Sequence, residues 1–294
     1  MACINAQSAS VNGESKYFSE GIIYSRTSFP GHPLNDTIKA LKFYNGDFNK
    51  QSRVIQALKE YQQSIKQEDE QSIKDAFFIS AMMVLPQYSQ MYFTRAGSLV
   101  KTYALGYSQE VVVNNQEHSG KLVLVDRDKN NQGTINFSTN DTLEVWQKYQ
   151  VGIAQYSKQE TTEIANVAGY PCKKIIYTFN GNSGGIPVTN YIVNMQPVRL
   201  TVWYTDQLPN TINLIHPLYF ELDKAVLKFE VEYDKNRKNK MLVEITGLEP
   251  RKINEDDLRL MEIAPSIDHK KNDQQSTIMI MQIMMNAIGQ LTKQ

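Results

Sequence analysis

The feature that most constrains this chain is an alternation of apolar and polar residues with a period of two. Its clearest example runs from Ala225 to Tyr233, where the odd positions are apolar and the later even positions are charged. This pattern is typical of a β-strand with one face on a core and the other in water. Similar segments recur at 21–28, 89–94, 99–105, 109–113, 121–126, 134–137, 159–167, 172–179, 189–194, 198–205 and 241–246.

The connections between these segments support an antiparallel arrangement. Residues 129–133 and 180–185 are rich in Asn and Gly, which tolerate the positive φ angles of tight hairpin turns. Short strands at this spacing predict an antiparallel meander, hence an open sheet, a half-barrel or a sandwich. A chain of 294 residues is long enough to bury a sizeable core.

One long interruption separates the first strand from the rest. Between Ser52 and Leu85 the apolar residues fall mostly three or four positions apart, which predicts a helical stripe that ends at Pro86. The acidic, glutamine-rich residues 67–71 provide no apolar anchor, so a break between two helices is favoured. We therefore expect a helical insertion at about 47–86.

The end of the chain has a different composition. Residues 265–275 are polar and predict a linker, whereas 277–291 are dense in Ile and Met. Met adapts to irregular apolar surfaces, so this segment predicts a helix that docks on its own domain, with membrane-surface or partner contact as alternatives. The expected organisation is an N-terminal segment (1–19), a single antiparallel β domain (20–264), and a linker with a Met-rich helix (265–294).

Charge and cysteine content exclude several classes of protein. The 31 Lys and Arg residues balance 31 Asp and Glu residues, and no basic block suggests a nucleic-acid surface. Cys3 and Cys172 are too few for a disulfide framework or a four-ligand zinc site. No apolar run is long enough to predict a transmembrane helix.

The first residues suggest export. Ile4-Asn5-Ala6 before Gln7 resembles the end of a secretory signal peptide, although the basic and apolar parts are missing. A truncated lipobox with Cys3 as the acylated residue and an ordinary cytosolic start are the alternatives. We expect an exported protein, in the periplasm or associated with an outer membrane.

No motif nominates a catalytic residue. The segment 181–185, centred on Ser183, is similar to the sequence around the nucleophile of chymotrypsin-like proteases, but Asn182 replaces the usual aspartate and no histidine has a matching setting. The four histidines are scattered without metal-ligand spacing. We therefore expect a non-enzymatic protein without a cofactor or metal.

One loop copies part of a calcium-binding motif. Asp126, Asp128 and Asn130 occupy the first three ligand positions of an EF-hand loop. Asn131 stands where the motif has Gly, and Phe137 stands where it has the bidentate Glu. A hairpin connection is therefore the favoured interpretation, and a weak surface calcium site is the alternative.

Four segments in order resemble one protein family. The first is Met-Tyr-Phe at 91–93 with 97–101 and the strand that follows, and the second is Val-Ala-Gly-Tyr-Pro-Cys-Lys-Lys at 167–174. The third is Trp-Tyr-Thr-Asp at 203–206, and the fourth is a Met-containing strand that ends in a Glu-rich turn at 241–257. Together they resemble a group of exported Bacteroidetes proteins of mostly unknown role, which look like relatives of the LolA/LolB lipoprotein carriers. The resemblance spans about residues 88–260.

The resemblance implies a strongly curved antiparallel half-barrel with helices over an apolar concave side. In the carriers this hollow holds the acyl chains of a lipoprotein. The helical insertion and the Met-rich tail depart from the family pattern, and either segment would be able to plug the hollow. The candidate ligand-binding residues on the concave face are Leu200, Val202, Tyr204, Ala225, Leu227, Phe229 and Val231. Their alternative role is plain core packing.

Two functions follow from these expectations. The first is a carrier or binding protein for an apolar ligand, such as acyl chains or a lipidated protein, held by burial between sheet and helices. The second is a structural or interaction protein of the cell envelope whose core is filled by its own side chains. A carrier requires an accessible apolar cavity, whereas an interaction protein predicts a filled core and an exposed apolar patch.

Overall fold

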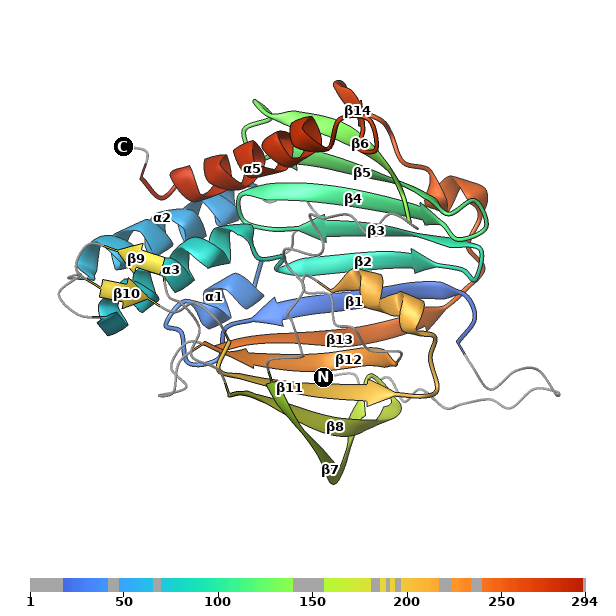
Figure 1. Cartoon of the computed structure of the whole chain (residues 1–294), viewed down its shortest axis with the longest axis horizontal. Coiled ribbons are helices and arrows are strands. Elements are labelled where there is room, and N and C mark those ends of the chain that lie inside the picture. Colours follow the sequence, from blue (N-terminus) through green and yellow to red (C-terminus); the bar gives the residue numbers. More distant parts are fainter. Residues whose placement is uncertain are drawn as a thin grey trace.

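The computed structural model describes residues 18–41, 48–65, 70–139, 156–180, 186–188, 191–193, 197–216, 224–233 and 240–292. Within these residues most of the chain forms one large sheet with helices packed around it (Figure 1). The strands of this sheet are β1 (Gly21–Ser28), β2 (Tyr88–Phe93), β3 (Gly97–Tyr103), β4 (Tyr107–Asn114), β5 (Ser119–Asp126), β6 (Gln132–Ser138), β7 (Tyr156–Val167), β8 (Tyr170–Phe179), β11 (Arg199–Thr205), β12 (Ala225–Glu232), β13 (Lys240–Pro250) and β14 (Ser266–Asp268).

The order of the strands is β14-β6-β5-β4-β3-β2-β1-β13-β12-β11-β8-β7. Neighbouring strands are antiparallel except for β14, which runs parallel to β6. The chain therefore builds one half of the sheet as the meander β2 to β6, while β1 pairs with β13 and joins this meander to the other half. Two short strands, β9 (Ile186–Val188) and β10 (Tyr191–Val193), form a separate hairpin.

The helices gather at two places. The insertion between β1 and β2 contains α1 (Asn35–Lys39), α2 (Phe48–Ser64) and α3 (Glu70–Val84), which lie at one end of the strands in Figure 1. The C-terminal helix α5 (Asp273–Gly289) contacts β4, β5, β6 and α3. Two 3-10 helices, η3 (Asn210–Ile215) and η4 (Glu255–Leu258), follow β11 and β13.

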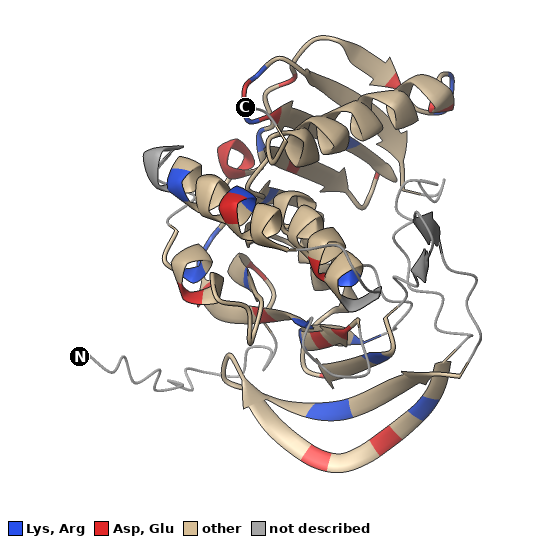
Figure 2. Cartoon of the chain, turned by 90° about the vertical axis from the view of Figure 1, so that its left-hand side faces the viewer, with Lys and Arg blue, Asp and Glu red and all other residues tan. Residues whose placement is uncertain are grey.

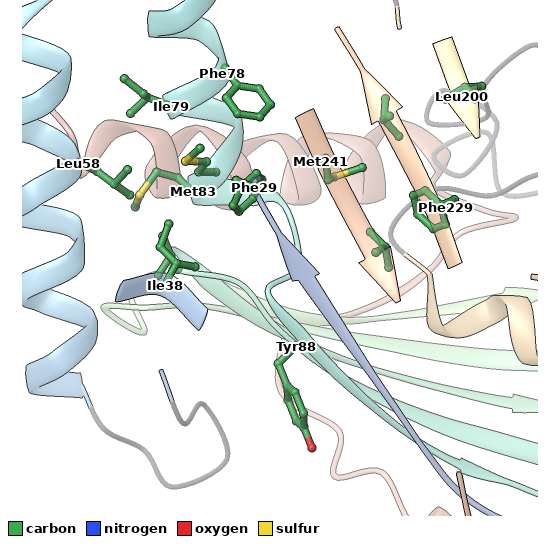
Figure 3. Packing of buried hydrophobic residues seen from close by; sticks show 14 of the residues in the cluster. Phe29, Ile38, Leu58, Phe78, Ile79, Met83, Tyr88, Leu200, Phe229 and Met241 are labelled. Carbon is green, nitrogen blue, oxygen red and sulfur yellow. The ribbon is translucent and has the colours of Figure 1, made fainter. Parts of the chain in front are cut away.

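Buried apolar residues form three clusters along this sheet. The first joins the helical insertion to β8, β11, β12 and β13, and Figure 3 shows Phe78, Ile79 and Met83 of α3 opposite Phe229 and Met241 of the strands. The second cluster lies around η3. The third lies between α5 and strands β4 to β6. Each cluster thus buries sheet residues under a different helical cover.

The structure confirms the mainly β class, the helical insertion after the first strand and the C-terminal helix. The insertion is divided as expected, because α2 ends at Ser64 and α3 begins at Glu70. The polar segment expected to be a linker instead contains β14, whose carbonyl and amide groups extend the sheet beyond β6. The strand expected at 189–194 overlaps β10, but part of it lies outside the described residues, as do Cys3, Ser183 and most of the hairpin at 180–185.

Candidate functional site

The predicted ligand-binding residues lie on strands β11 and β12, and four of the seven are in the middle of two apolar rows that cross four strands. One row pairs Tyr177, Leu200, Val231 and Met241 in register. The next row consists of Ile175, Val202, Phe229 and Val243. Residues in register on neighbouring antiparallel strands pack side by side, so these eight side chains form a continuous surface.

A β-bulge divides the seven predicted residues between two clusters. Lys228 pairs with Trp203, but the next residue of β11, Tyr204, pairs with Val226, which leaves Leu227 as the extra residue. A bulge of this kind changes the phase of the alternation along a strand. Val226 therefore joins the first cluster with Phe229 and Val231, whereas Ala225 and Leu227 belong to the second cluster.

The helical insertion and Phe29 cover the strand residues of the first cluster. Of the seven predicted residues, only Tyr204 is partly exposed. The other six are 0% exposed: Leu200, Val202, Ala225, Leu227, Phe229 and Val231. Phe29, Phe78 and Met83 fill the space opposite the strands (Figure 3). An apolar ligand would reach these strands only if the helical cover moved.

The C-terminal helix docks closely on the sheet through small residues. Gly106, between β3 and β4, donates its N–H to the carbonyl of Met83 at 3.1 Å. A methyl group at Gly106 would lie 2.7 Å from Cα of Ala287, closer than packed atoms tolerate. The inward face of α5 also carries Ser276 and Ile283, both 0% exposed. Short side chains at Gly106 and Ala287 thus allow α5 to approach both α3 and the sheet.

A buried carboxylate connects α5 to the β5–β6 hairpin. Asp126 is 3% exposed, and its two oxygens accept hydrogen bonds from the backbone N–H groups of Asn130 (2.9 Å) and Asn131 (3.1 Å). They also accept from the side-chain amides of Asn131 (2.8 Å) and Asn286 (3.1 Å). Burial alone would raise the pKa of Asp126, but these donors favour the ionised form and lower the pKa below its usual value.

The same hydrogen bonds decide between the two interpretations of the calcium-like loop. Four donors already occupy the Asp126 oxygens, so this carboxylate stabilises the turn and holds Asn286 of α5. Asp128 and Asn130 are exposed beside it. No group of three His, Cys, Asp or Glu side chains is placed to hold a metal ion anywhere in the described part of the chain. The favoured interpretation, a hairpin connection, agrees with this geometry.

The opposite side of α5 exposes large apolar side chains. Ile278, Met281 and Met285 are 46%, 59% and 64% exposed, and we call these three residues the α5 outer face. Their spacing of three and four residues places them along one side of the helix. Figure 2 shows the body of α5 free of charged residues between its ends. The helix therefore carries an apolar stripe on each of two sides, and only one of them is covered.

Sequence reasoning identified this segment as an adaptable apolar surface but assigned no face to it. The positions of its smallest residues distinguish the docked side of the helix from the exposed side. Ser276 and Ala287 lie on the docked side together with Met279, Ile280 and Ile283. A helical projection centred on the two small residues would have placed Ile278, Met281 and Met285 outside.

Three further reactive groups, on Cys172, His216 and His269, are buried. Cys172 is a free, fully buried thiol, and burial raises its pKa to about 11. Burial lowers the pKa of His216 to about 4, and its Nε2 lies 2.6 Å from the carbonyl of Val226. His269 Nδ1 lies 2.7 Å from Ser276 Oγ, but Ser276 is 0% exposed and also contacts the carbonyl of Asn272. These contacts fix η3 to β12 and the first turn of α5 to the segment before it.

No family model matches the chain, and no curated protein matches it. Among solved structures, one described as the structure of PNGF-II in the C2 space group is similar to 67% of this chain at 15% sequence identity and a TM-score of 0.36. The matched part corresponds to only 30% of that protein. Within the described residues, no helix is both long and apolar enough to cross a membrane.

Proposed function

We propose that this chain is a non-enzymatic interaction protein of the cell envelope, which binds a protein partner through the α5 outer face. The observation that carries the proposal is the exposure of Ile278, Met281 and Met285 along one side of a helix whose other side is docked. Helices that bind in grooves present apolar anchors at this spacing. Exposed apolar residues gathered in this way commonly mark a contact surface.

The composition of α5 favours a protein over a membrane surface as the partner. Helices that lie on membranes usually combine an apolar face with Lys and Arg on the polar face, which are attracted to anionic lipids. From Asp273 to Gly289 the chain contains no Lys or Arg. Two of the three outer-face residues are Met, whose flexible side chain fits partner surfaces of irregular shape.

The alternative function, a carrier of acyl chains, stays a prediction. It requires an opening to the predicted ligand-binding residues, and six of these residues are 0% exposed. The filled first cluster therefore favours the interaction protein over the carrier. We further propose that the chain is related to the half-barrel lipoprotein carriers and that it is exported. Fractionation of the tagged chain in its native cells tests the location.

Site-specific photocrosslinking in those cells tests the proposed surface. A photoreactive amino acid is placed at Met281 or Met285 and, as a control, at Ile164 of β7, which is 68% exposed. We expect one discrete protein adduct from both α5 positions and none from Ile164. An adduct with twice the mass of the chain would identify a second copy as the partner.

A matched pair of charge substitutions then connects the cross-link to the surface. Met285→Glu is expected to abolish the adduct from Met281, whereas Ile164→Glu, at a similarly exposed apolar residue, leaves it intact. Adducts formed only with lipid, or an equal response to both substitutions, would contradict the proposal. An acyl lipid that copurifies with the full chain in native mass spectrometry would favour the carrier.

A further inference from the structure

A surface groove of about 460 Å³ lies between the β2–β3 turn and the segment that leads from β11 into η3. Phe18, Phe93 and Leu208 form apolar parts of its lining, and Arg95 and Asp206 are charged residues that also line it. The volume falls in the range of about 300–1,000 Å³ that is common for small-molecule sites. The groove contains none of the residues of the α5 outer face.

The apolar part of the groove is aromatic. The rings of Phe18 and Phe93 are stacked, with 6.0 Å between their centroids and an angle of 24° between their planes. Phe18 and Phe93 are 8% and 1% exposed, so the stack is anchored in the second cluster and meets the groove mainly through the edge of Phe18. Aromatic rings attract further rings in offset or edge-to-face geometry, beyond the effect of buried area alone.

Hydrogen bonds hold both walls of the groove in place. On the η3 side, Asn213 accepts the N–H of Val226 at 2.8 Å and donates to the carbonyl of Lys224 at 2.9 Å. On the β2–β3 side, the side-chain amide of Asn115 donates to the carbonyl of Arg95 at 3.2 Å. A site whose walls are already ordered loses less conformational entropy when a ligand binds.

The charges at the groove leave a positive excess. Asp206 is engaged by two lysines, with Lys224 Nζ at 2.8 Å and Lys173 Nζ at 3.4 Å from its carboxylate oxygens. The hydrogen bonds from these two lysines lower the pKa of Asp206, so its charge is matched near neutral pH. The exposed guanidinium of Arg95 forms no ion pair with any described residue. Lys173 and Lys224 thus balance Asp206, and Arg95 is a further cation in the lining of the groove.

We propose that this groove binds an aromatic carboxylate, with the ring on the Phe18–Phe93 stack and the carboxylate on Arg95. Arg suits this role because its planar guanidinium pairs with both oxygens of a carboxylate. The same chemistry exists in a free aromatic acid and in the C-terminal phenylalanine of a peptide. The ligand therefore needs one aromatic group within a few bonds of an anionic end.

Three related ligands test the two halves of this proposal on the full chain. Binding of naphthylacetate, followed by NMR titration, is compared with its saturated decahydronaphthyl counterpart and with its neutral amide. We expect the saturated ring to bind about threefold to tenfold more weakly, because it loses the aromatic contact. The amide is expected to bind at least about tenfold more weakly, because it loses the charge-assisted pair. Equal binding of all three would overturn the proposal.

Three substitutions locate the binding. Arg95→Gln should weaken naphthylacetate binding by about tenfold or more and leave the weak binding of the amide unchanged. Arg259→Gln, at an exposed arginine outside the groove, is the matched control and should change neither. Thr211→Trp places a large side chain at an exposed lining residue and should abolish binding without a change in the urea midpoint.

The source of the carboxylate follows from one further comparison. A short acetylated peptide that ends in phenylalanine is titrated beside naphthylacetate, with the C-terminal amide of the same peptide as its control. If the peptide binds more tightly, the groove binds the C-terminus of a peptide; if naphthylacetate binds more tightly, the groove binds a free aromatic acid. In either case Arg95→Gln must weaken the binding of that ligand. Identical effects of Arg95→Gln and Arg259→Gln, or unchanged binding in Thr211→Trp, would contradict the proposed groove.

Discussion

Helices α3 and α5 have similar sequences of Met, Ile and Ala residues but different surroundings. Met82 and Met83 of α3 are both 0% exposed, whereas Met281 and Met285 of α5 are 59% and 64% exposed. α3 lies among α2, α5 and the first cluster, and α5 rests on β4 to β6 with α3 beside it. None of the described elements covers the outer face of α5.

The comparison shows that Met content does not distinguish a core helix from a contact helix. What distinguishes them is the number of elements that pack around each one, which depends on the topology of the whole sheet. A helix surrounded by partners loses stability when its side chains are shortened. A helix with one open side loses stability only when its docked side is changed.

The largest expected difference between the two helices is the loss in free energy of unfolding when one methionine of each is replaced by alanine. Met83→Ala should lower the free energy of unfolding by about 3 kcal/mol, because it removes buried methylenes and leaves a cavity in the first cluster. Met285→Ala should change it by less than about 0.5 kcal/mol. Urea unfolding measures the free energy of unfolding of both variants, with the m-value expected to stay unchanged. Similar losses in the two variants would refute the comparison.

The next effect is at the contact between the two helices. Gly106→Ala should cost about 2 kcal/mol, because the added methyl group would lie 2.7 Å from Ala287 Cα and 3.2 Å from the carbonyl oxygen of Met83. Hydrogen exchange should show faster opening of α5. Gly289→Ala in α5 is the control, since its methyl group would meet no atom within 4 Å. Equal exchange rates in the two variants would mean that α5 does not depend on this approach.

A smaller effect is expected from the carboxylate that holds α5. Asp126→Asn should cost about 1–2 kcal/mol at pH 7, because an amide satisfies fewer of the four donors than the carboxylate does. Glu255→Gln, at an exposed carboxylate of η4, is the control and should change the free energy of unfolding by less than about 0.5 kcal/mol.

The pH dependence of that cost has a defined sign. The folded pKa of Asp126 lies below the unfolded value of about 3.9, so its stabilisation is fully present above about pH 5 and is lost as the pH falls through the folded pKa. The difference between the wild-type protein and Asp126→Asn should therefore shrink between pH 5 and pH 2. Urea midpoints across this range measure it, and a difference that stays constant would exclude the assigned role.

The sequence predicts the elements of this fold better than their contacts. Period-two alternation located the strands of the large sheet other than β14, because most of them bury one face; β7, which is exposed along most of its length, is an exception. The bulge at Leu227 was not predictable in this way, since it arises from the pairing of β12 with β11 and appears only when both strands are aligned. The short strand β14 has three residues, too few to show a period, and its place beside β6 is a long-range contact.

The candidate sites show the same limit. Leu200, Val202, Phe229 and Val231 were recognised as one apolar surface, but their closure by α3 depends on where the insertion folds back. The groove joins Phe18, Arg95 and Leu208, which are far apart in the sequence. None of the three belongs to a motif, so no local pattern identified them. Sites assembled from loops of distant strands require the topology first.

The smallest effect on stability, and the most direct measure of the open side of α5, is expected from oxidation of methionine. Under limiting peroxide, Met281 and Met285 should form sulfoxide at least about tenfold faster than Met82 and Met83, because oxidation requires solvent access. Peptide mass spectrometry measures the four rates in one sample. The urea midpoint of the partly oxidised protein should not change, whereas its photocrosslinking through α5 should decrease, because a sulfoxide is polar. Comparable oxidation rates in the two helices would mean that α3 opens to solvent as readily as α5, and the distinction between a core helix and a contact helix would then be lost.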